Sequence, residues 1–159
     1  MSNYKIGKFI WEPEHINLFK EGYKDIEGIY PDQFTMKDIQ KNIVDNYHGR
    51  VLLFGKKPVG LTLTDLKSSA YRGAELFQFY ISPEHREKWF GSILLTHTLK
   101  DLMEREIKLV FADVQYDNKP TLSLLKKFGF NRIKDEMRGS NVYTILKKYI
   151  AKKTKISKI

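Results

Sequence analysis

The sequence predicts an α/β fold in which one mixed sheet carries helices on its faces, and three observations indicate it. The chain has 159 residues, a length typical of one domain with its own core. Hydrophobic residues make up 42% and charged residues 30%, the balance of a globular protein. Segments typical of strands and helices alternate through the second half, which favours parallel strands joined by crossover helices. We expect about six to seven strands and about four helices.

The first half is predicted to form a strand, two helices and a hairpin. Alternating apolar residues over 4–11 indicate the strand. Pro13 begins a helix that is expected to end near Gly22. Thr35 is expected to cap a second helix, over 36–47, with Tyr47 at the end of its apolar stripe. The remaining predicted elements are strands 50–55 and 58–66, joined as a hairpin at Lys56-Lys57.

The second half is predicted to alternate strictly before closing in a hairpin. Leu95, Leu99 and Leu102 have helical spacing. Pro120 and Gly129 stand at the start and just past the end of another helix. The expected elements are strand 73–82, helix 91–105, strand 108–115, helix 118–130, and strands 130–137 and 141–149 around Arg138-Gly139-Ser140, with parallel pairing between 74 and 115.

Charge and composition limit the partners and the compartment. Net charge is +9, and six lysines with no acidic residue follow from Lys147 onward. We divide the chain into a domain over 1–148 and a basic tail over 149–159, which either attracts nucleic acid and other anions or is a solvated terminus. The absence of cysteine excludes disulfides and thiolate sites. Neither a signal peptide nor an apolar run of ~20 residues is visible, so we expect a cytoplasmic protein.

The stretch ISPEHREKWFGSILL, residues 81–95, joins a predicted strand to a predicted helix and has features of an anion-binding loop. The first N–H groups of the helix point into the loop, where the helix dipole favours an anion. Arg86 and Lys88 add positive charge, and Gly91 permits close backbone approach. A plain structural turn explains the same residues. Trp89 stands where such loops usually carry glycine.

Two motifs in this order resemble the GCN5-related N-acetyltransferase (GNAT) superfamily. Arg86 to Gly91 resembles its acetyl-CoA loop, R/Q-x-x-G-x-G/A, and the preceding YISPEHR resembles V-x-P-E-x-R. NKPTLSLLKKFGF, residues 118–130, resembles N-x-x-A-x-x-x-Y-x-x-x-G-F. Trp89 departs from the first loop glycine, although its amide remains. Leu125 stands where many members have a tyrosine that protonates the leaving thiolate, and core packing accounts for it equally well.

The resemblance implies acetyl-CoA as cosubstrate and needs no metal. It implies that loop amides over 86–92 hold the pyrophosphate. It further implies that the pantetheine arm runs along Phe79 to Ile81 and binds Asn118. The implied cofactor-binding residues are Phe79, Ile81, Arg86, Glu87, Lys88, Trp89, Phe90, Gly91, Ser92 and Asn118. The four histidines, His15, His48, His85 and His97, lack metal-ligand spacing; His97 is expected to be exposed and His85 to pack.

Glu75 is the candidate general base, because acyl transfer needs a neutral amine. It precedes Arg86 by eleven residues, a spacing similar to that of the catalytic glutamate in the histone acetyltransferase branch. A solvent-facing glutamate at a strand start is the alternative. Strict alternation places Gln78 and Tyr80 on the opposite face from Glu75, Phe77, Phe79 and Ile81. Tyr116 or Tyr143 is a candidate acid, Asp113 and Gln115 lie nearby on the next strand, and Tyr30, Phe34, Gln78 and Tyr80 are candidates for the acceptor pocket.

Two functions follow from these patterns. The first is an N-acetyltransferase that transfers the acetyl group of acetyl-CoA to a primary amine, by direct attack in a ternary complex. The acceptor is a small molecule or a protein, and the enzyme is a monomer or a homodimer. The alternative is a catalytically weakened module of the same fold that binds nucleic acid, or acts on tRNA or DNA, through its basic surface.

Overall fold

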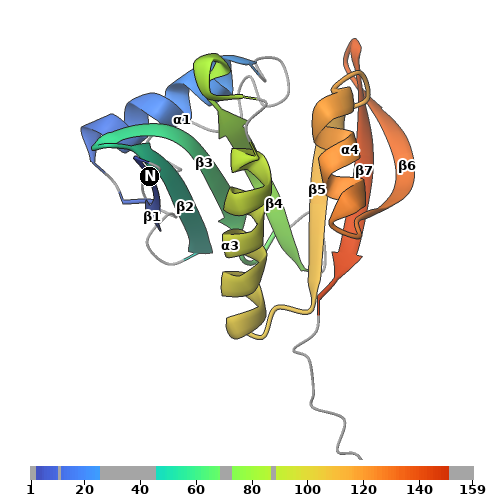
Figure 1. The fold of residues 1–159 in the computed structure, drawn as a ribbon. Coiled ribbons are helices and arrows are strands. Elements are labelled where there is room, and N and C mark those ends of the chain that lie inside the picture. The colour runs from blue at the N-terminus through green and yellow to red at the C-terminus, as the bar shows by residue number, and fades with distance from the viewer. Residues whose placement is uncertain (1–2, 11, 26–45, 69–72, 87–88, 151–159) are drawn as a thin grey trace, which may run out of the picture.

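A computed structural model describes residues 3–10, 12–25, 46–68, 73–86 and 89–150. These residues form a seven-stranded mixed sheet in the order β1-β2-β3-β4-β5-β7-β6, with helices on both faces (Figure 1). The sequence prediction of a mixed α/β fold is therefore confirmed. The strands are β1 (Tyr4–Lys8), β2 (Tyr47–Phe54), β3 (Lys57–Asp65), β4 (Ala74–Ile81), β5 (Leu109–Gln115), β6 (Asn131–Arg138) and β7 (Asn141–Tyr149), and the helices are α1 (Pro13–Asp25), the 3-10 turn η1 (Pro83–His85), α3 (Phe90–Glu104) and α4 (Lys119–Lys127).

The sheet consists of two antiparallel parts joined by one short parallel ladder. β1 to β4 pair antiparallel in chain order, and β5, β7 and β6 form the second part. β4 and β5 pair in parallel over Ala74 to Leu76 only. Beyond Leu76 the two strands diverge, as the upper part of Figure 1 shows. The parallel pairing predicted between 74 and 115 is confirmed, but it covers only the start of β4.

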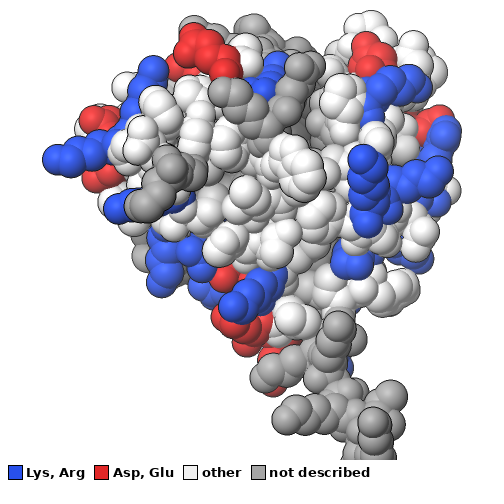
Figure 2. All heavy atoms as spheres, viewed as in Figure 1, with Lys and Arg blue, Asp and Glu red and all other residues white. Residues whose placement is uncertain are grey.

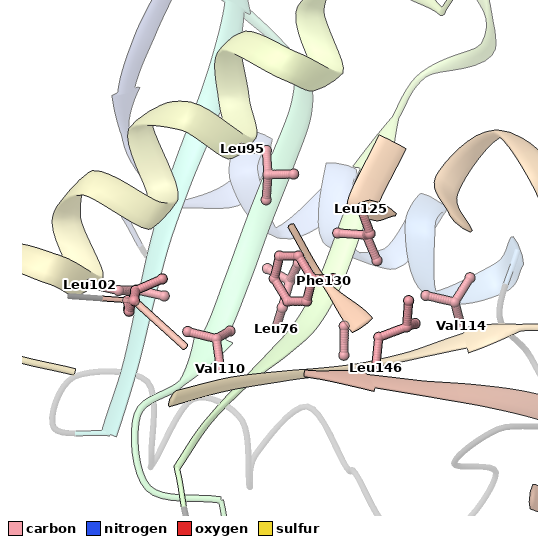
Figure 3. Packing of buried hydrophobic residues seen from close by; sticks show 10 residues of the cluster. Leu76, Leu95, Leu102, Val110, Val114, Leu125, Phe130 and Leu146 are labelled. Carbon is pink, nitrogen blue, oxygen red and sulfur yellow. The ribbon is translucent and has the colours of Figure 1, made fainter. Parts of the chain in front are cut away.

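Each face of the sheet has its own core. On one face, α3 and α4 contribute Leu95, Leu102 and Leu125 to a cluster with apolar residues of β4, β5 and β7. Figure 3 shows Leu95 and Leu125 near Phe130 and Leu76, and Leu102 beside Val110. On the other face, Leu18 and Phe19 of α1 pack against residues of β2 to β4. The predicted stripe on α3 is confirmed, because Leu95 and Leu102 are fully buried and Leu99 packs against the same cluster.

Helix α1 does not end where its glycine suggested. It continues past Gly22 to Asp25. A Cβ built on Gly22 would lie 2.6 Å from Nε2 of Gln78 and 2.8 Å from Cγ of Tyr80. Gly22 is therefore the place where α1 approaches β4 closely, and not a helix end. The predicted helix over 36–47 lies outside the described residues except at its end, where Tyr47 instead begins β2.

The end of α3 farthest from the diverging strands is bound to β2 by charged groups. Asp101 accepts a hydrogen bond from Nη2 of Arg50 at 2.7 Å and also contacts its Nε. Nε2 of His48 lies 2.7 Å from the same carboxylate. Burial lowers the pKa of His48, and this carboxylate opposes the shift. This network is structural, because it lies away from the cleft described below.

The described fold reaches the end of β7 and one residue beyond it. Ile150 is buried and its N–H donates to the carbonyl of Lys108 at 2.8 Å. The lysine-rich residues 151–159 lie outside the described part. Within the described residues, no helix is long and apolar enough to cross a membrane.

Candidate active site

A cleft of about 780 Å³ opens where β4 and β5 diverge. Its walls come from β4, β5, the start of α3 and the start of α4. Parallel strands that separate in this way leave backbone N–H and C=O groups without a strand partner. The lining residues most relevant to the predictions are Glu75, Gln78, Phe79, Tyr80, Ile81, Arg86, Trp89, Gly91, Ser92, Asp113, Gln115, Asn118 and Leu125.

A β-bulge at Phe77 changes which side chains share a face of β4. Thr64 of β3 pairs with Leu76, but the preceding Leu63 pairs with Gln78, so Phe77 is an extra residue. The alternation of side chains therefore shifts by one position after Leu76.

The prediction that Gln78 and Tyr80 lie opposite Glu75 is wrong for this reason. The β3 partners of Glu75, Gln78 and Tyr80 are every second residue of that strand, so these three side chains lie on the same face of the sheet. Tyr80 packs with the α1 cluster. Phe79 instead packs against the α3 and α4 cluster. The bulge thus places a carboxylate, a carboxamide and a phenol on one wall of the cleft.

The splayed end of β4 offers backbone hydrogen bonds to the cleft. The N–H of Ser82 donates to Val59 of β3 at 2.8 Å, so Tyr80 and Ser82 direct their backbone groups to β3. By alternation, Phe79 and Ile81 direct theirs to the side where β5 has separated. The carbonyl of Ile81 accepts from Nε of Arg86 at 2.6 Å. The N–H groups of Phe79 and Ile81 are positioned to bind an extended chain.

The start of α3 closes one end of the cleft with backbone amides. Gly91 lies close to the opposite wall, because a Cβ there would be 3.1 Å from Leu124 Cδ2 and 3.2 Å from Phe79 Cζ. Trp89 caps the helix with φ +33° and ψ −1°, in the left-handed region. Trp89, which stands at the position of the first loop glycine, thus adopts a conformation that favours glycine.

The other predicted loop residues differ in where their side chains point. The ring of Phe90 packs on Tyr4 with 3.9 Å between ring centroids, and Phe90 does not line the cleft. Arg86 lies over the Tyr80 ring, with 5.4 Å from its guanidinium carbon to the ring centroid. Ser92 lines the cleft. Glu87 and Lys88 lie outside the described residues.

Asn118 stands at the start of α4 and lines the cleft. Its Oδ1 accepts from the N–H of Thr121 at 3.3 Å and caps the helix. That bond does not use its side-chain NH₂ group.

Lys119, Lys126 and Lys127 of α4 are exposed. Figure 2 shows Lys and Arg side chains gathered over α4 and the closing hairpin, beside the cleft.

Glu75 lies at the point where β4 and β5 separate. It is 8% exposed, which contradicts the solvent-facing alternative. Oγ of Ser68 donates to its Oε1 at 2.9 Å. Burial raises the pKa of Glu75, and the nearby Asp113 carboxylate raises it further. A carboxylate with a raised pKa is a better proton acceptor than an ordinary surface glutamate.

Asp113 brings the closing hairpin into the site, a link that the sequence did not indicate. Nη2 of Arg138 donates to Oδ2 of Asp113 at 2.6 Å. The guanidinium carbon of Arg138 lies 5.1 Å from the centroid of the Tyr143 ring. The partners are 25 residues apart in the chain. The pairing of β7 with β5 on one side and with β6 on the other brings them together.

Gln78 carries the most unusual polar atom of the cleft. The residue is 4% exposed, and its Nε2 donates to the carbonyl of Phe19 at 3.3 Å. Its Oε1 has no hydrogen-bond partner among the described residues. Buried carbonyl oxygens are rarely left without a donor. The site therefore contains an acceptor atom that a bound N–H group would satisfy.

The other residues singled out in the sequence lie in different parts of the fold or outside the described residues. Tyr116 is 52% exposed at the end of β5 and does not line the cleft. Tyr143 is fully buried, and its hydroxyl has no partner among the described residues. Leu125 is 1% exposed, which confirms core packing. Tyr30 and Phe34 lie outside the described residues.

Two of the histidines, His85 and His97, have the surroundings that the sequence predicted. His97 is exposed on α3, as predicted. His85 packs by η1, where the Tyr4 hydroxyl lies 2.9 Å from its Nδ1. In the part of the chain that the structure describes, no group of three His, Asp or Glu side chains could hold a metal ion.

The geometry of the cleft agrees with a sequence comparison. The model of the acetyltransferase (GNAT) family matches residues 12–130. The chain belongs to the GNAT family. That stretch contains the cleft-lining residues of β4, β5, α3 and α4. No curated protein sequence matches the chain.

Solved structures of GNAT-type acetyltransferases share the fold at low identity. The ribosomal-protein-S18-alanine N-acetyltransferase from Escherichia coli aligns with a TM-score of 0.73 and 16% identity, over 98% of this chain and 99% of that one. An N-acetyltransferase from Staphylococcus aureus Mu50 gives 0.74 and 15%, over 93% and 99%. A chain of the NatC complex bound to Gag peptide and CoA gives 0.73 and 10%, over 94% and 99%.

Acetyl-CoA, the cosubstrate of GNAT acetyltransferases, matches the chemistry of the cleft. The uncovered N–H groups of Phe79 and Ile81 suit the amide-bearing pantetheine arm. The first amides of α3 suit the pyrophosphate, with Arg86 nearby. Because Gly91 of α3 lies close to Phe79 of β4, the amides of the helix start are next to those of the strand. The residues present therefore fit the ligand that the family uses.

Proposed function

We propose that this GNAT protein is an N-acetyltransferase that moves the acetyl group of acetyl-CoA onto a primary amine. The observation that carries the proposal is the buried Glu75 at the apex of the β4–β5 cleft. There the family's cosubstrate site meets a side chain able to take a proton. Burial and Asp113 raise the pKa of Glu75, which suits it to deprotonating an ammonium group near neutral pH.

The transfer is a direct displacement in a ternary complex. Acetyl-CoA supplies the acetyl group as a thioester. Glu75, or a water that it orients, takes a proton from the amine, whose nitrogen then forms the new C–N bond. The C–S bond breaks, and the departing thiolate takes up, through water, the second proton that the nitrogen loses as the amide forms. The N–H of Phe79, which is nearer to Glu75 along β4 than that of Ile81, polarises the carbonyl oxygen. The chain has no cysteine, so the usual thiol for an acetyl-enzyme is lacking.

The acceptor binds on the α1-facing wall. Glu75, Gln78 and Tyr80 share that face of β4 because of the bulge at Phe77. The unpartnered Oε1 of Gln78 accepts an N–H of the acceptor, and Tyr80 lines the same wall. Both small amines and protein amino groups carry the required N–H donors.

Acetyl-CoA titration by calorimetry tests the first half of the proposal. We expect binding by the wild type and at least roughly tenfold weaker binding by Ser92→Glu, which places an acid among the α3 amides. Thr96→Glu, one turn later on the exposed side of α3, is the matched control and should bind normally. A wild type that does not bind acetyl-CoA would overturn the proposal.

Thiol release tests the second half. The panel contains an alkylamine, a polyamine, a peptide with a free N-terminus and a lysine peptide with a blocked one. Intersecting double-reciprocal lines are expected for a ternary complex. Parallel lines would contradict direct transfer.

The nucleic-acid alternative rests on the basic composition alone. Its main feature, the lysines beyond Ile150, lies outside the described residues. No specific contact or groove among the described residues favours it.

A further inference from the structure

Trp89 combines an exposed ring with a disfavoured backbone. Its side chain is largely in solvent, since the residue is 86% exposed. Its φ of +33° lies in the region that favours glycine, which costs free energy for any residue with a Cβ. The neighbouring Phe90 packs on Tyr4, whereas Trp89 makes no ring contact with another described aromatic residue. Packing within the described fold therefore does not compensate the strain.

The location of Trp89 relates the ring to the cosubstrate site. Trp89 lines the cleft together with Gly91 and Ser92, at the end closed by the first amides of α3. In acetyl-CoA the pyrophosphate joins the pantetheine arm to the adenosine. If the arm extends inward along Phe79 and Ile81, the adenosine leaves the pyrophosphate on the outward side. Trp89 is the exposed aromatic residue beside that position.

We propose that the Trp89 indole stacks on the adenine of acetyl-CoA and forms the adenine subsite of this enzyme. Purine faces stack well on aromatic rings, and tryptophan has the largest such surface. The inference rests on the proposed function, because it takes the ligand from it. It also accounts for a strained tryptophan in a loop position suited to glycine, because stacking in the complex offsets the strain of the free protein.

Replacement by glycine distinguishes the effect of the indole ring from the effect of the backbone conformation. Trp89→Gly removes the indole and leaves a residue that adopts φ +33° without a Cβ penalty. The α3 amides and the loop course are therefore retained. Glu106→Gly is the matched control, because Glu106 has φ +63° just beyond the other end of α3. It relieves a similar strain away from the cleft.

The test compares ligands with and without adenine. CoA and 4′-phosphopantetheine are titrated into the wild type, Trp89→Gly, Trp89→Phe and Glu106→Gly by calorimetry. We expect Trp89→Gly to weaken CoA binding roughly tenfold and to leave phosphopantetheine unchanged, with Trp89→Phe between. Glu106→Gly should bind both ligands as the wild type does.

Fluorescence gives an independent readout. The chain has two tryptophans, so Trp11→Phe leaves Trp89 as the sole indole reporter. CoA and adenosine 3′-phosphate 5′-diphosphate should quench its emission with saturation, and phosphopantetheine should not.

The outcomes separate this inference from the proposed function. If the wild type binds CoA but Trp89→Gly binds it equally well or better, adenine stacking is wrong and the acetyltransferase proposal stands. If Trp89→Gly weakens phosphopantetheine as much as CoA, Trp89 acts through the loop and the subsite is again wrong. If the wild type binds neither CoA nor acetyl-CoA, both proposals fail together.

Discussion

The two ends of β4 show how one strand serves both the fold and the site. At its start, Ala74 to Leu76 pair with β3 or β5, and Leu76 lies in the core with α3 and α4. At its end, Phe79 and Ile81 keep their β3 partners but lose β5. The paired end gains stability from hydrogen bonds and burial. The splayed end leaves the same backbone groups available to a ligand. Leu76 is therefore the last residue of β4 that pairs with β5, and the ligand-binding part of the strand follows it.

Glu75→Gln is expected to have the largest effect, because Glu75 stands at the boundary between the two ends. Loss of the general base should lower turnover by about 10²- to 10⁴-fold while acetyl-CoA binding stays unchanged. Glu84→Gln is the control. Glu84 is an exposed glutamate of η1 that does not line the cleft, so turnover should change little. Unchanged turnover in Glu75→Gln would remove Glu75 as the base.

Leu76→Ala and Ile81→Ala compare the two ends directly, since the two side chains are 6% and 8% exposed. Leu76→Ala should lower the free energy of unfolding by about 3–5 kcal/mol, because its cavity is enclosed by the core cluster. Ile81→Ala should cost only about 2 kcal/mol, because the cleft beside it allows relaxation, but it should weaken acetyl-CoA binding. Chemical denaturation and calorimetry measure both effects. Equal destabilisation without a binding defect would contradict the division.

Gln78→Leu tests the acceptor wall at the splayed end. Loss of Oε1 should raise the KM for the amine roughly tenfold and leave the acetyl-CoA Kd unchanged. Stability should fall by no more than about 1 kcal/mol, because the variant also removes a buried carbonyl that lacks a donor. Gln115→Leu, the glutamine of the β5 wall, is the comparison. An unaltered KM in Gln78→Leu would mean that Oε1 does not bind the acceptor.

The smallest expected effect is on the pH dependence of stability. Because the pKa of Glu75 is raised on folding, the folded state holds its proton more tightly than the unfolded state. Stability should therefore fall as pH rises from the usual carboxyl pKa through the raised one. Glu75→Gln removes this term, so the variant should be more stable than the wild type at pH 8 and lose that advantage toward pH 4. Denaturation curves that keep the same difference across this range would contradict the raised pKa.

Much of the fold was predictable because local signals agreed with one another. The turn at Lys56, the apolar stripe of α3, and Pro120 with Gly129 around α4 all indicated the elements that form. The prediction that the first helix ends near Gly22 was wrong, because a glycine that permits close packing cannot be told from one that ends a helix in the sequence alone. The loop and the Asn118 motif located the cleft.

The sequence by itself determined the order of elements and the loop whose amides suit an anion. These depend on periodicity, on helix ends and on residue type, which act over a few neighbouring positions. The resemblance to a known family indicated the candidate base. Only the tertiary structure decided which residues face each other. The bulge at Phe77 arises from pairing with β3, and it moved Gln78 and Tyr80 to the Glu75 wall. The Asp113–Arg138 bond required β7 to lie beside β5. The left-handed backbone of Trp89 was also visible only in the structure, because a residue with a Cβ favours negative φ on its local preference alone.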